Sequence, residues 1–255
     1  MKPYTGKVII ATFFYKHQAY LEYCNAIVAS TIALERLGIK FDYRLVSGNF
    51  HMELCINELL TNFMEEEDAT DILMIDSDES WNPEHLIRLL FHEEDIVCGV
   101  YRKCCIDKID FPVILCTADD GSHLGKMLPD GNCLLEAKRV PAGFLKISKR
   151  ALKRWVEAFP DRWIWYGEKR VYAFFGNEIR DHSFNGMDFC FTDSMREAGL
   201  HVWVDPICEI THWGIYPFKG TLDAKLRALK ANQEAGNAFS IVEQMAKDIE
   251  DGKCS

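Results

Sequence analysis

The 255-residue chain lacks several features that would each assign it to a class of proteins at once. No run approaches the roughly 20 apolar residues that cross a bilayer, so we expect no membrane span. There is no basic excess either, because 29 Lys and Arg stand against 39 Asp and Glu and the net charge is -10. Phosphate neutralisation supplies most of the affinity for duplex DNA, so this balance argues against a dedicated nucleic-acid-binding protein.

Cysteine is abundant, with ten residues, but the spacing typical of zinc ligands is missing because no Cys-x-x-Cys pair occurs. The N-terminus has no small-residue cleavage site, and we interpret its apolar run as a first strand rather than a signal peptide. Without an export signal, reduced and mostly buried thiols are expected, and so is a cytoplasmic location. The cysteines in apolar segments are Cys24, Cys55, Cys98, Cys190 and Cys208.

The first half of the sequence alternates short apolar runs with stretches of helical spacing. The apolar runs are residues 7–14, 41–46, 71–76 and 95–101, and the helical stretches are 18–37, 52–66 and 82–92. Continuous apolar strands separated by helices indicate a parallel sheet that is covered on both faces. The predicted fold class is therefore α/β.

The second half is more mixed, and no repeat, low-complexity segment or linker interrupts it. We expect antiparallel strands at 112–118 and 132–140, a strand at 143–148 with a helix after it to 158, an aromatic and irregular segment at 161–184, a helix at 187–198, a strand at 201–206 and a helical tail at 222–251. We predict one domain over residues 1–220, with a helical extension over 221–255 packed on it.

Two aspartates directly follow an apolar strand in ILMIDSDESW, residues 72–81. Asp76 ends the apolar run and Asp78 comes one residue later, so their like charges repel unless something positive lies beside them. Ligands of an open parallel sheet bind at the carboxyl ends of its strands, where carboxylates suit a hard divalent ion that also binds phosphate oxygens. The alternative interpretation is a solvated turn in which Asp78 starts the next helix.

A single histidine in CEITHWG, His212, is a candidate third ligand. Manganese-type ions accept mixed oxygen and nitrogen ligands, so Asp76, Asp78 and His212 form a plausible set. The alternative is an ordinary, partly buried imidazole.

Four segments, taken in order, resemble the nucleotide-sugar glycosyltransferases of the GT-A fold. They are ILMIDSDESWNPEHLIRLL, DIVCGVYRK, VPAGFLKISKRAL and GMDFCFTDSMREAGLHVWVDPICEITHWG. The chain looks closest to the compact soluble type of phages, large viruses and bacterial sugar-polymer pathways, over about residues 7–215. The resemblance implies a Rossmann-like, mostly parallel sheet flanked by helices, with a small antiparallel β element and a C-terminal helical tail.

The resemblance also implies roles for individual residues. Asp76 and Asp78 match the Asp-x-Asp metal and nucleotide motif, and His212 matches the late histidine that closes a Mn²⁺ or Mg²⁺ site. Asp188 matches the general base of inverting members, although Met187 stands where the motif has glutamate. The alternative for Asp188 is stabilisation of a helix N-terminus through the helix dipole.

Further residues are assigned to the donor by position in the family. Small residues beneath the donor sugar are Ala142 and Gly143, which let backbone approach the ligand closely, although a tight turn explains them as well. The residues assigned to the base and ribose pocket are Thr12, Phe13 and Phe14. Asn57 matches the asparagine of an Arg-Asn pair that relatives often have on the second helix, and it is also assigned to the nucleotide sugar. Ile56 replaces an arginine of the relatives, which leaves Arg102, Lys103 or Lys219 as candidates for the diphosphate. The aromatics Trp163, Trp165, Tyr166 and Tyr172 either form an acceptor platform or fill the core.

The expected activity is transfer of a sugar from a nucleoside-diphosphate sugar to an acceptor hydroxyl on a glycan, a protein or another molecule, with inversion if Asp188 is the base. One alternative is the same chemistry on a hydroxylated base of viral DNA, in a host cytoplasm. A second is a nucleotidyltransferase, although ATFFYKHQ contains no glycine-rich phosphate loop. A third is a non-catalytic nucleotide-sugar-binding protein, which would explain Met187. The sugar, the nucleotide and the oligomeric state stay open.

Overall fold

A mostly parallel sheet of nine strands forms the centre of the structure, a computed structural model that describes residues 4–14, 17–47, 51–214 and 217–233. The strand order is β2-β1-β3-β9-β5-β14-β8-β6, with β7 paired to β8 at one edge. Its strands are β1 (Lys7–Phe14), β2 (Lys40–Ser47), β3 (Ala69–Asp76), β5 (Ile96–Gly99), β6 (Ile114–Leu115), β7 (Gly125–Met127), β8 (Cys133–Arg139), β9 (Phe144–Ser148) and β14 (Val202–Asp205). The predicted α/β class with a mostly parallel sheet is confirmed.

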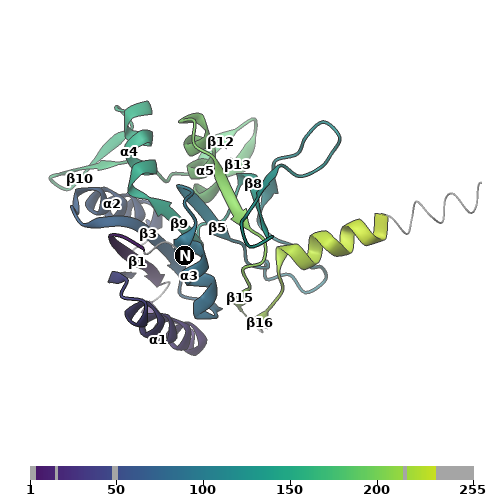
Figure 1. The fold of residues 1–255 in the computed structure, drawn as a ribbon. Helices are drawn as coiled ribbons and strands as arrows, with labels where there is room; N and C mark the ends of the chain where they lie inside the picture. Colours follow the sequence, from purple (N-terminus) through teal and green to yellow (C-terminus); the bar gives the residue numbers. More distant parts are fainter. Residues whose placement is uncertain (1–3, 15–16, 48–50, 215–216, 234–255) are drawn as a thin grey trace, which may run out of the picture.

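Helices cover both faces of this sheet (Figure 1). They are α1 (Leu21–Arg36), α2 (Met52–Glu65), α3 (Pro83–Phe91), α4 (Lys149–Ala158) and α5 (Met187–Glu197). Successive residues of β1 point to opposite faces, so Ile9 packs with the core under α2, α4 and α5, whereas Ile10 packs with the core under α1 and α3. This explains why six consecutive residues of the strand, from Val8 to Phe13, are buried.

The strand β9 runs antiparallel to both of its neighbours, β3 and β5. A strand that enters the sheet in reverse starts where its neighbours end. The residues just before β9, Ala142 and Gly143, therefore lie at the carboxyl end of β3, and the amide of Asp76 donates to the carbonyl of Gly143 at 2.9 Å. One reversed strand thus brings two segments some 65 residues apart onto one edge of the sheet.

A second small sheet joins the end of β3 to a late part of the chain. It consists of β4 (Glu79–Trp81), β15 (Ile210–Trp213) and β16 (Pro217–Phe218). In the antiparallel pair β4·β15, His212 lies opposite Glu79. The amide of Trp213 donates to the carbonyl of Asp78 at 2.7 Å, which fixes this register beside the acidic turn.

The segment 161–184, expected to be irregular, is mostly β structure. It forms the hairpin β10 (Trp163–Tyr166) with β11 (Lys169–Tyr172), and it begins a second hairpin of β12 (Glu178–Arg180) with β13 (Ser183–Asn185). The turn of the second hairpin places Asp181 and His182 at positive φ, of 50° and 60°. Two consecutive residues at positive φ form the tight hairpin turn that matches the twist of the strands, and such turns usually contain glycine. This turn contains no glycine, so the sequence pattern did not indicate a hairpin.

The C-terminal part is helical over 222–233, where the described part of the chain ends. Leu222 is buried and Leu226 packs against the main core, whereas the residues from 227 onward are exposed and the helix points away from the body (Figure 1). Only the first turns of the helix thus contact the domain. The rest of the proposed extension, 234–255, lies outside the described residues.

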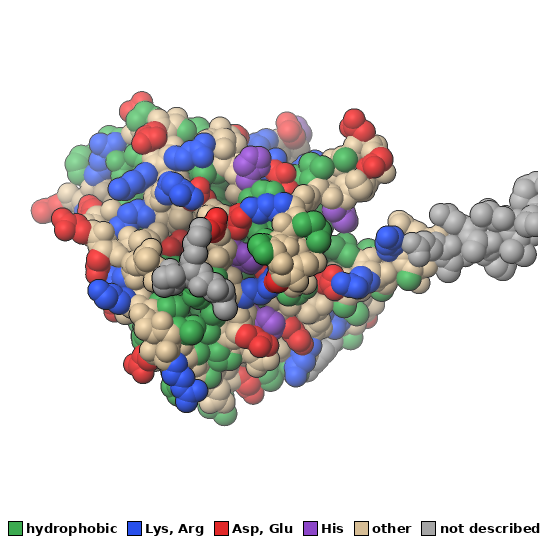
Figure 2. All heavy atoms as spheres, viewed as in Figure 1, with side chains coloured by type: hydrophobic (Ala, Val, Ile, Leu, Met, Phe, Trp, Pro, Cys, Tyr) green, Lys and Arg blue, Asp and Glu red, His purple; other side chains and the backbone are tan. Residues whose placement is uncertain are grey.

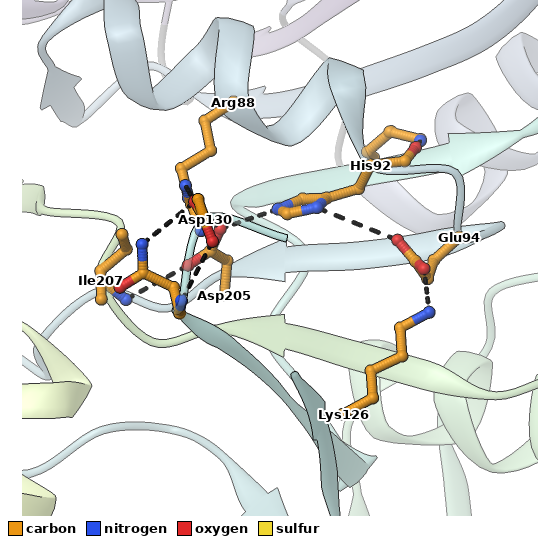
Figure 3. Close-up of polar contacts among 9 residues, drawn as sticks. Arg88, His92, Glu94, Lys126, Asp130, Asp205 and Ile207 are labelled. Carbon is orange, nitrogen blue, oxygen red and sulfur yellow. Dashed lines mark hydrogen bonds and ion pairs between the residues drawn. The ribbon is translucent and has the colours of Figure 1, made fainter. Parts of the chain in front are cut away.

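A polar network fastens the end of α3 to the end of β14 (Figure 3). Asp205 is fully buried and accepts from Arg88 Nε at 2.5 Å, and its Oδ2 lies 2.7 Å from His92 Nε2. Arg88 also donates to Asp130 at 2.7 Å, and Glu94 pairs with Lys126. Because every charged group has an opposite partner, the network explains its own burial and needs no ligand.

The net negative charge is unevenly spread over the surface. On the face seen in Figure 2, Lys and Arg side chains gather over α4, which carries Lys149, Arg150, Lys153 and Arg154. No helix within the described ranges has the length and apolar character to cross a membrane.

Asn57, expected at the nucleotide, fastens α2 to the segment that follows β11. Its side chain is 1% exposed, its Nδ2 donates to the carbonyl of Phe175, and its Oδ1 accepts from the amide of Phe175, both at 2.7 Å. The amide group is thus used by the protein itself. A role in nucleotide binding stays a prediction without a contact in support.

Replacing Asn57 by Ala should lower the free energy of unfolding by about 1–3 kcal/mol, because a buried donor and a buried acceptor of Phe175 lose their partners. Denaturant titration measures this change. The matched control is Asn25→Ala on the exposed side of α1, which should stay within about 0.5 kcal/mol of the parent. Equal effects of the two substitutions would contradict the structural role of Asn57.

Candidate functional site

The acidic turn after β3 is held rigidly by the segment that precedes α1. The Ser77 hydroxyl donates to the carbonyl of Gln18 at 3.1 Å, and the Tyr20 amide donates to the carbonyl of Ser77 at 3.1 Å. Ser77 is buried, whereas Asp76 and Asp78 on either side of it are partly exposed. The turn therefore buries its middle residue and presents both carboxylates at the edge of the sheet.

His212 lies against the second of these carboxylates. Its Nε2 is 3.4 Å from Asp78 Oδ2, and its Nδ1 lies 3.2 Å from the carbonyl of Arg102 and 3.4 Å from Cys104 Sγ. Burial lowers the pKa of His212, but the hydrogen bond and charge of Asp78 outweigh this, so the pKa is raised. The structure thus brings together two proposed metal ligands that are 134 residues apart.

The charges of Asp78, Asp188 and His212 also influence Asp76. Its pKa is raised to about 7, first by burial and then by the charges of Asp78 and Asp188, while His212 lowers it. The influence of Asp188 indicates that the candidate base and the candidate metal ligands occupy one site.

Asp188 is the second residue of α5, at the end of the helix where negative charge is favoured. Its Oδ2 accepts from the amide of Ala142 at 3.3 Å, and its Oδ1 is buried and has no hydrogen-bond partner. Burial raises the pKa of Asp188, and the bond from Ala142 opposes this. The contact also places Ala142, expected beneath the donor sugar, directly beside the candidate base.

Met187, where the resembling family has glutamate, packs against the main apolar core. A glutamate in this position would place a charge against that core, so packing accounts for the departure from the motif.

Glu79 is the residue that sequence reasoning missed. It is fully buried, and neither of its carboxylate oxygens has a hydrogen-bond partner among the described residues. Burial raises its pKa well above the ordinary value, and Asp76, Asp78 and Asp188 raise it further. A signal was present in the sequence, because alternation in Glu-Ser-Trp puts Glu79 on the same face as the buried Trp81.

Gly143 makes room for these carboxylates. A Cβ atom added to it would lie 2.5 Å from Glu79 Oε1, 2.6 Å from Asp76 Oδ2 and 2.8 Å from a ring carbon of Tyr101. Only glycine fits without displacing them.

The remaining residues assigned to the nucleotide lie at the end of β1. Phe13 is the register partner of Asp76 on β3, but its side chain is buried in the core. Phe14 packs edge-on against Tyr23 at 5.9 Å, and the hydroxyl of the buried Thr12 lies 2.6 Å from that of Tyr23. The end of β1 is a suitable position for a nucleotide. The side chains of Thr12 and Phe13, however, contact other residues of the protein interior.

The candidate cations for the diphosphate are partly engaged elsewhere. Arg102 donates to the carbonyls of Cys105 and Lys108, and Lys103 pairs with Asp110 at 3.0 Å. Lys219 lines a separate recess of about 410 Å³ between α1 and β4.

The aromatic segment lies apart from the acidic group. The β10–β11 hairpin packs beside α2, at the opposite side of the molecule from β15 in Figure 1. Tyr172 packs against Phe174 of the core, whereas Trp165 is 66% exposed. The core-filling interpretation fits Tyr172, and the acceptor-platform interpretation stays a prediction.

The donor set suits Mn²⁺ or Mg²⁺ better than a soft metal, since it consists of carboxylates and one imidazole. Buried oxygens without partners at Glu79 and Asp188 are what an oxygen-binding cation would satisfy. As the side chains stand, however, no group of three or more His, Cys, Asp or Glu among the described residues is arranged to hold one ion. The residues fit the ion by chemistry, and their side chains must turn to bind it.

Compared by sequence, the chain matches no protein family and no curated protein. Solved structures show distant likenesses. The structure of A197 from STIV has 14% identity and a TM-score of 0.47, over 85% of this chain and 91% of that one. The catalytic domain of Drosophila beta1,4galactosyltransferase 7, in complex with xylobiose, has 14% identity and a TM-score of 0.43, over 85% and 69%.

A third likeness is GalNAc-T7 with UDP, GalNAc and Mn²⁺, at 9% identity and a TM-score of 0.38, over 82% of this chain and 44% of that one. Similarity this distant assigns no activity to the chain. A functional conclusion therefore depends on the chemistry of the acidic group itself.

The burial of the Tyr23 phenol predicts a loss of stability in alkali. Burial raises the pKa of Tyr23 to about 12, against the opposing bond to Thr12. A phenol whose pKa is raised by folding contributes stability that is complete below pH 10 and lost as the pH rises toward 12. The stability advantage of the parent over Tyr23→Phe should fall by up to about 3 kcal/mol across this range. Unfolding curves that run parallel from pH 9 to 12 would contradict it.

Proposed function

We propose that the chain is a metal-dependent glycosyltransferase that moves a sugar from a nucleoside-diphosphate sugar to an acceptor hydroxyl. The acceptor is most simply a glycan, because nothing in the charge balance favours a nucleic acid. The proposal assigns Asp76, Asp78 and His212 to the ion, Ala142 and Gly143 to the donor sugar, and Asp188 to proton removal.

One observation carries the proposal: His212 Nε2 lies 3.4 Å from Asp78 Oδ2. The two residues come from separate strands, β15 and the turn before β4, and the register of these strands sets them side by side. A chance Asp-x-Asp turn has no reason to receive a histidine from so distant a segment. A shared ion supplies that reason, since both groups are ligands for Mn²⁺.

A bound Mn²⁺ or Mg²⁺ neutralises charge on a departing diphosphate. The chain contributes the remaining steps through its own side chains. Ala142 and Gly143 let the donor sugar approach the backbone. Asp76 is the register partner of Phe13 near the end of β1, the strand end to which the proposal assigns the nucleotide.

Asp188 is suited to act as general base. Its raised pKa brings it nearer to neutrality, where a base combines correct ionisation with proton affinity. Ala142 holds Oδ2, which leaves Oδ1 to take the proton of the attacking hydroxyl. The acceptor oxygen bonds to the anomeric carbon as the bond to the diphosphate breaks. Attack from the opposite face inverts that carbon.

Asp188→Asn should lower turnover by about 10²- to 10⁴-fold, because the amide keeps the size of the carboxylate but takes no proton. Donor affinity should stay near that of the parent. Turnover is measured with a sugar-transfer assay and affinity by calorimetry. A variant that loses donor binding yet still transfers sugar would show that the role of Asp188 is misassigned.

Asp78→Ala should abolish the Mn²⁺-dependent part of donor binding, because it removes an ion ligand and the partner of His212. A thermal-shift screen of nucleotide sugars with and without Mn²⁺ measures this and identifies the donor. The control is Asp119→Ala, an exposed aspartate in a distant loop. If Asp78→Ala keeps the full Mn²⁺-dependent shift, the metal site is wrong. Release of pyrophosphate from a nucleoside triphosphate without sugar transfer would instead indicate a nucleotidyltransferase.

A further inference from the structure

Glu79 belongs to the acidic group, but the proposed function assigns it no role. It follows Asp78 directly and begins β4, opposite His212 in the strand pair. Its side chain is 0% exposed, and both of its carboxylate oxygens are buried without a hydrogen-bond partner. In a folded protein a buried carboxylate normally has a cationic or hydrogen-bonding partner, so this burial calls for an explanation.

The groups around Glu79 are other carboxylates, so they carry negative rather than positive charge. The position of a Cβ atom on Gly143 would be 2.5 Å from Glu79 Oε1 and 2.6 Å from Asp76 Oδ2, so these two oxygens face the same small space. Asp78 and Asp188 also act on Glu79 through their charges. No Lys or Arg among the described residues forms a hydrogen bond or an ion pair with it. Within the described part of the chain, Glu79 thus has no cationic partner, which leaves this position open to a bound cation.

We propose that Glu79 is a third carboxylate ligand of the divalent ion, acting with Asp76, Asp78 and His212. The inference builds on the proposed function, since it concerns the same ion. The Asp-x-Asp assignment names Asp76 and Asp78 as ligands. The inference adds one residue, the buried Glu79 that directly follows this acidic turn.

The chemistry of the ligand set supports this role. Three carboxylates and one imidazole match the mixed oxygen and nitrogen coordination of Mn²⁺. These residues would hold the ion by oxygen and nitrogen donors, and the ion would supply a positive charge for the diphosphate. Since the described side chains do not already surround one point, the ion must draw them together. Glu79 can follow because no other group holds its oxygens.

The role also accounts for two features of the neighbouring sequence. Gly143 is required because any larger residue would occupy the space between Glu79 and Asp76. The strand position of Glu79, inward like Trp81 and unlike Ser80, keeps the carboxylate on the ion side.

The test compares Mn²⁺ binding to the full-length metal-free parent and to Glu79→Gln, by calorimetry and by the electron paramagnetic resonance of free Mn²⁺. Glutamine keeps the size of the side chain and removes its charge. We expect the dissociation constant for Mn²⁺ to rise about 10- to 100-fold. In EDTA, Glu79→Gln should melt near the temperature of the parent, because without a cation the buried carboxyl holds a proton and glutamine matches its size and neutrality. Added Mn²⁺ should then stabilise the parent more than the variant.

Glu209→Gln is the matched control, because Glu209 is an exposed glutamate just before β15 and outside the acidic group. It should bind Mn²⁺ as the parent does. A second variant, Gly143→Ala, should weaken Mn²⁺ binding while keeping every charge, because its methyl group displaces the oxygens of Glu79 and Asp76. Parent-like Mn²⁺ affinity in Glu79→Gln would overturn the inference.

Asp78→Ala separates the two proposals. If it loses Mn²⁺ while Glu79→Gln keeps it, the role of Glu79 is overturned and the proposed function stands. If Glu79→Gln loses Mn²⁺ but the parent transfers no sugar from any donor, the ligand role is supported and the proposed function fails. If neither substitution changes Mn²⁺ binding, both proposals fail.

Discussion

The structure depends on an electrostatic constraint at the carboxyl end of β3, where four carboxylates meet one imidazole. Burial and the charges of Asp78 and Asp188 raise the pKa of Asp76, and His212 opposes this. Burial and the charges of Asp76, Asp78 and Asp188 raise the pKa of Glu79. In the network around Asp205, by contrast, buried charges are paired with groups of opposite charge (Figure 3). The acidic group is therefore a candidate ligand site, because buried oxygens of Glu79 and Asp188 have no hydrogen-bond partner among the described residues.

Topology assembles this group from four distant segments. The reversed strand β9 carries Ala142 and Gly143 to the end of β3, and the amide of Ala142 in turn fixes Asp188 at the start of α5. The small sheet of β4 and β15 adds His212. Each connection uses backbone hydrogen bonds, so the positions of the side chains follow from strand order and register rather than from flexible loops.

The sequence predicts the parts of this arrangement that depend on local pattern. The sequence alone shows the apolar run that ends in Asp76. It also shows the small residues, beginning at Ala142, that precede the next apolar strand. The burial of Glu79 is harder to predict, because three residues of alternation are too short to stand out. The hairpin turn at Asp181 and His182 was missed because it uses positive φ without glycine. The internal bonds of Asn57 and Thr12 depend on tertiary partners that no local pattern contains.

The departure at Met187 follows from the same constraint. Its side chain packs in the apolar core, so the acidic position of the resembling motif has become part of the packing. The adjacent Asp188 already raises the pKa values of Asp76 and Glu79. The acidic group already contains Glu79 in addition to the two aspartates of the Asp-x-Asp pattern. A further carboxylate next to Asp188 would increase the repulsion between these negative charges. Methionine at the start of α5 therefore avoids a further negative charge next to Asp188.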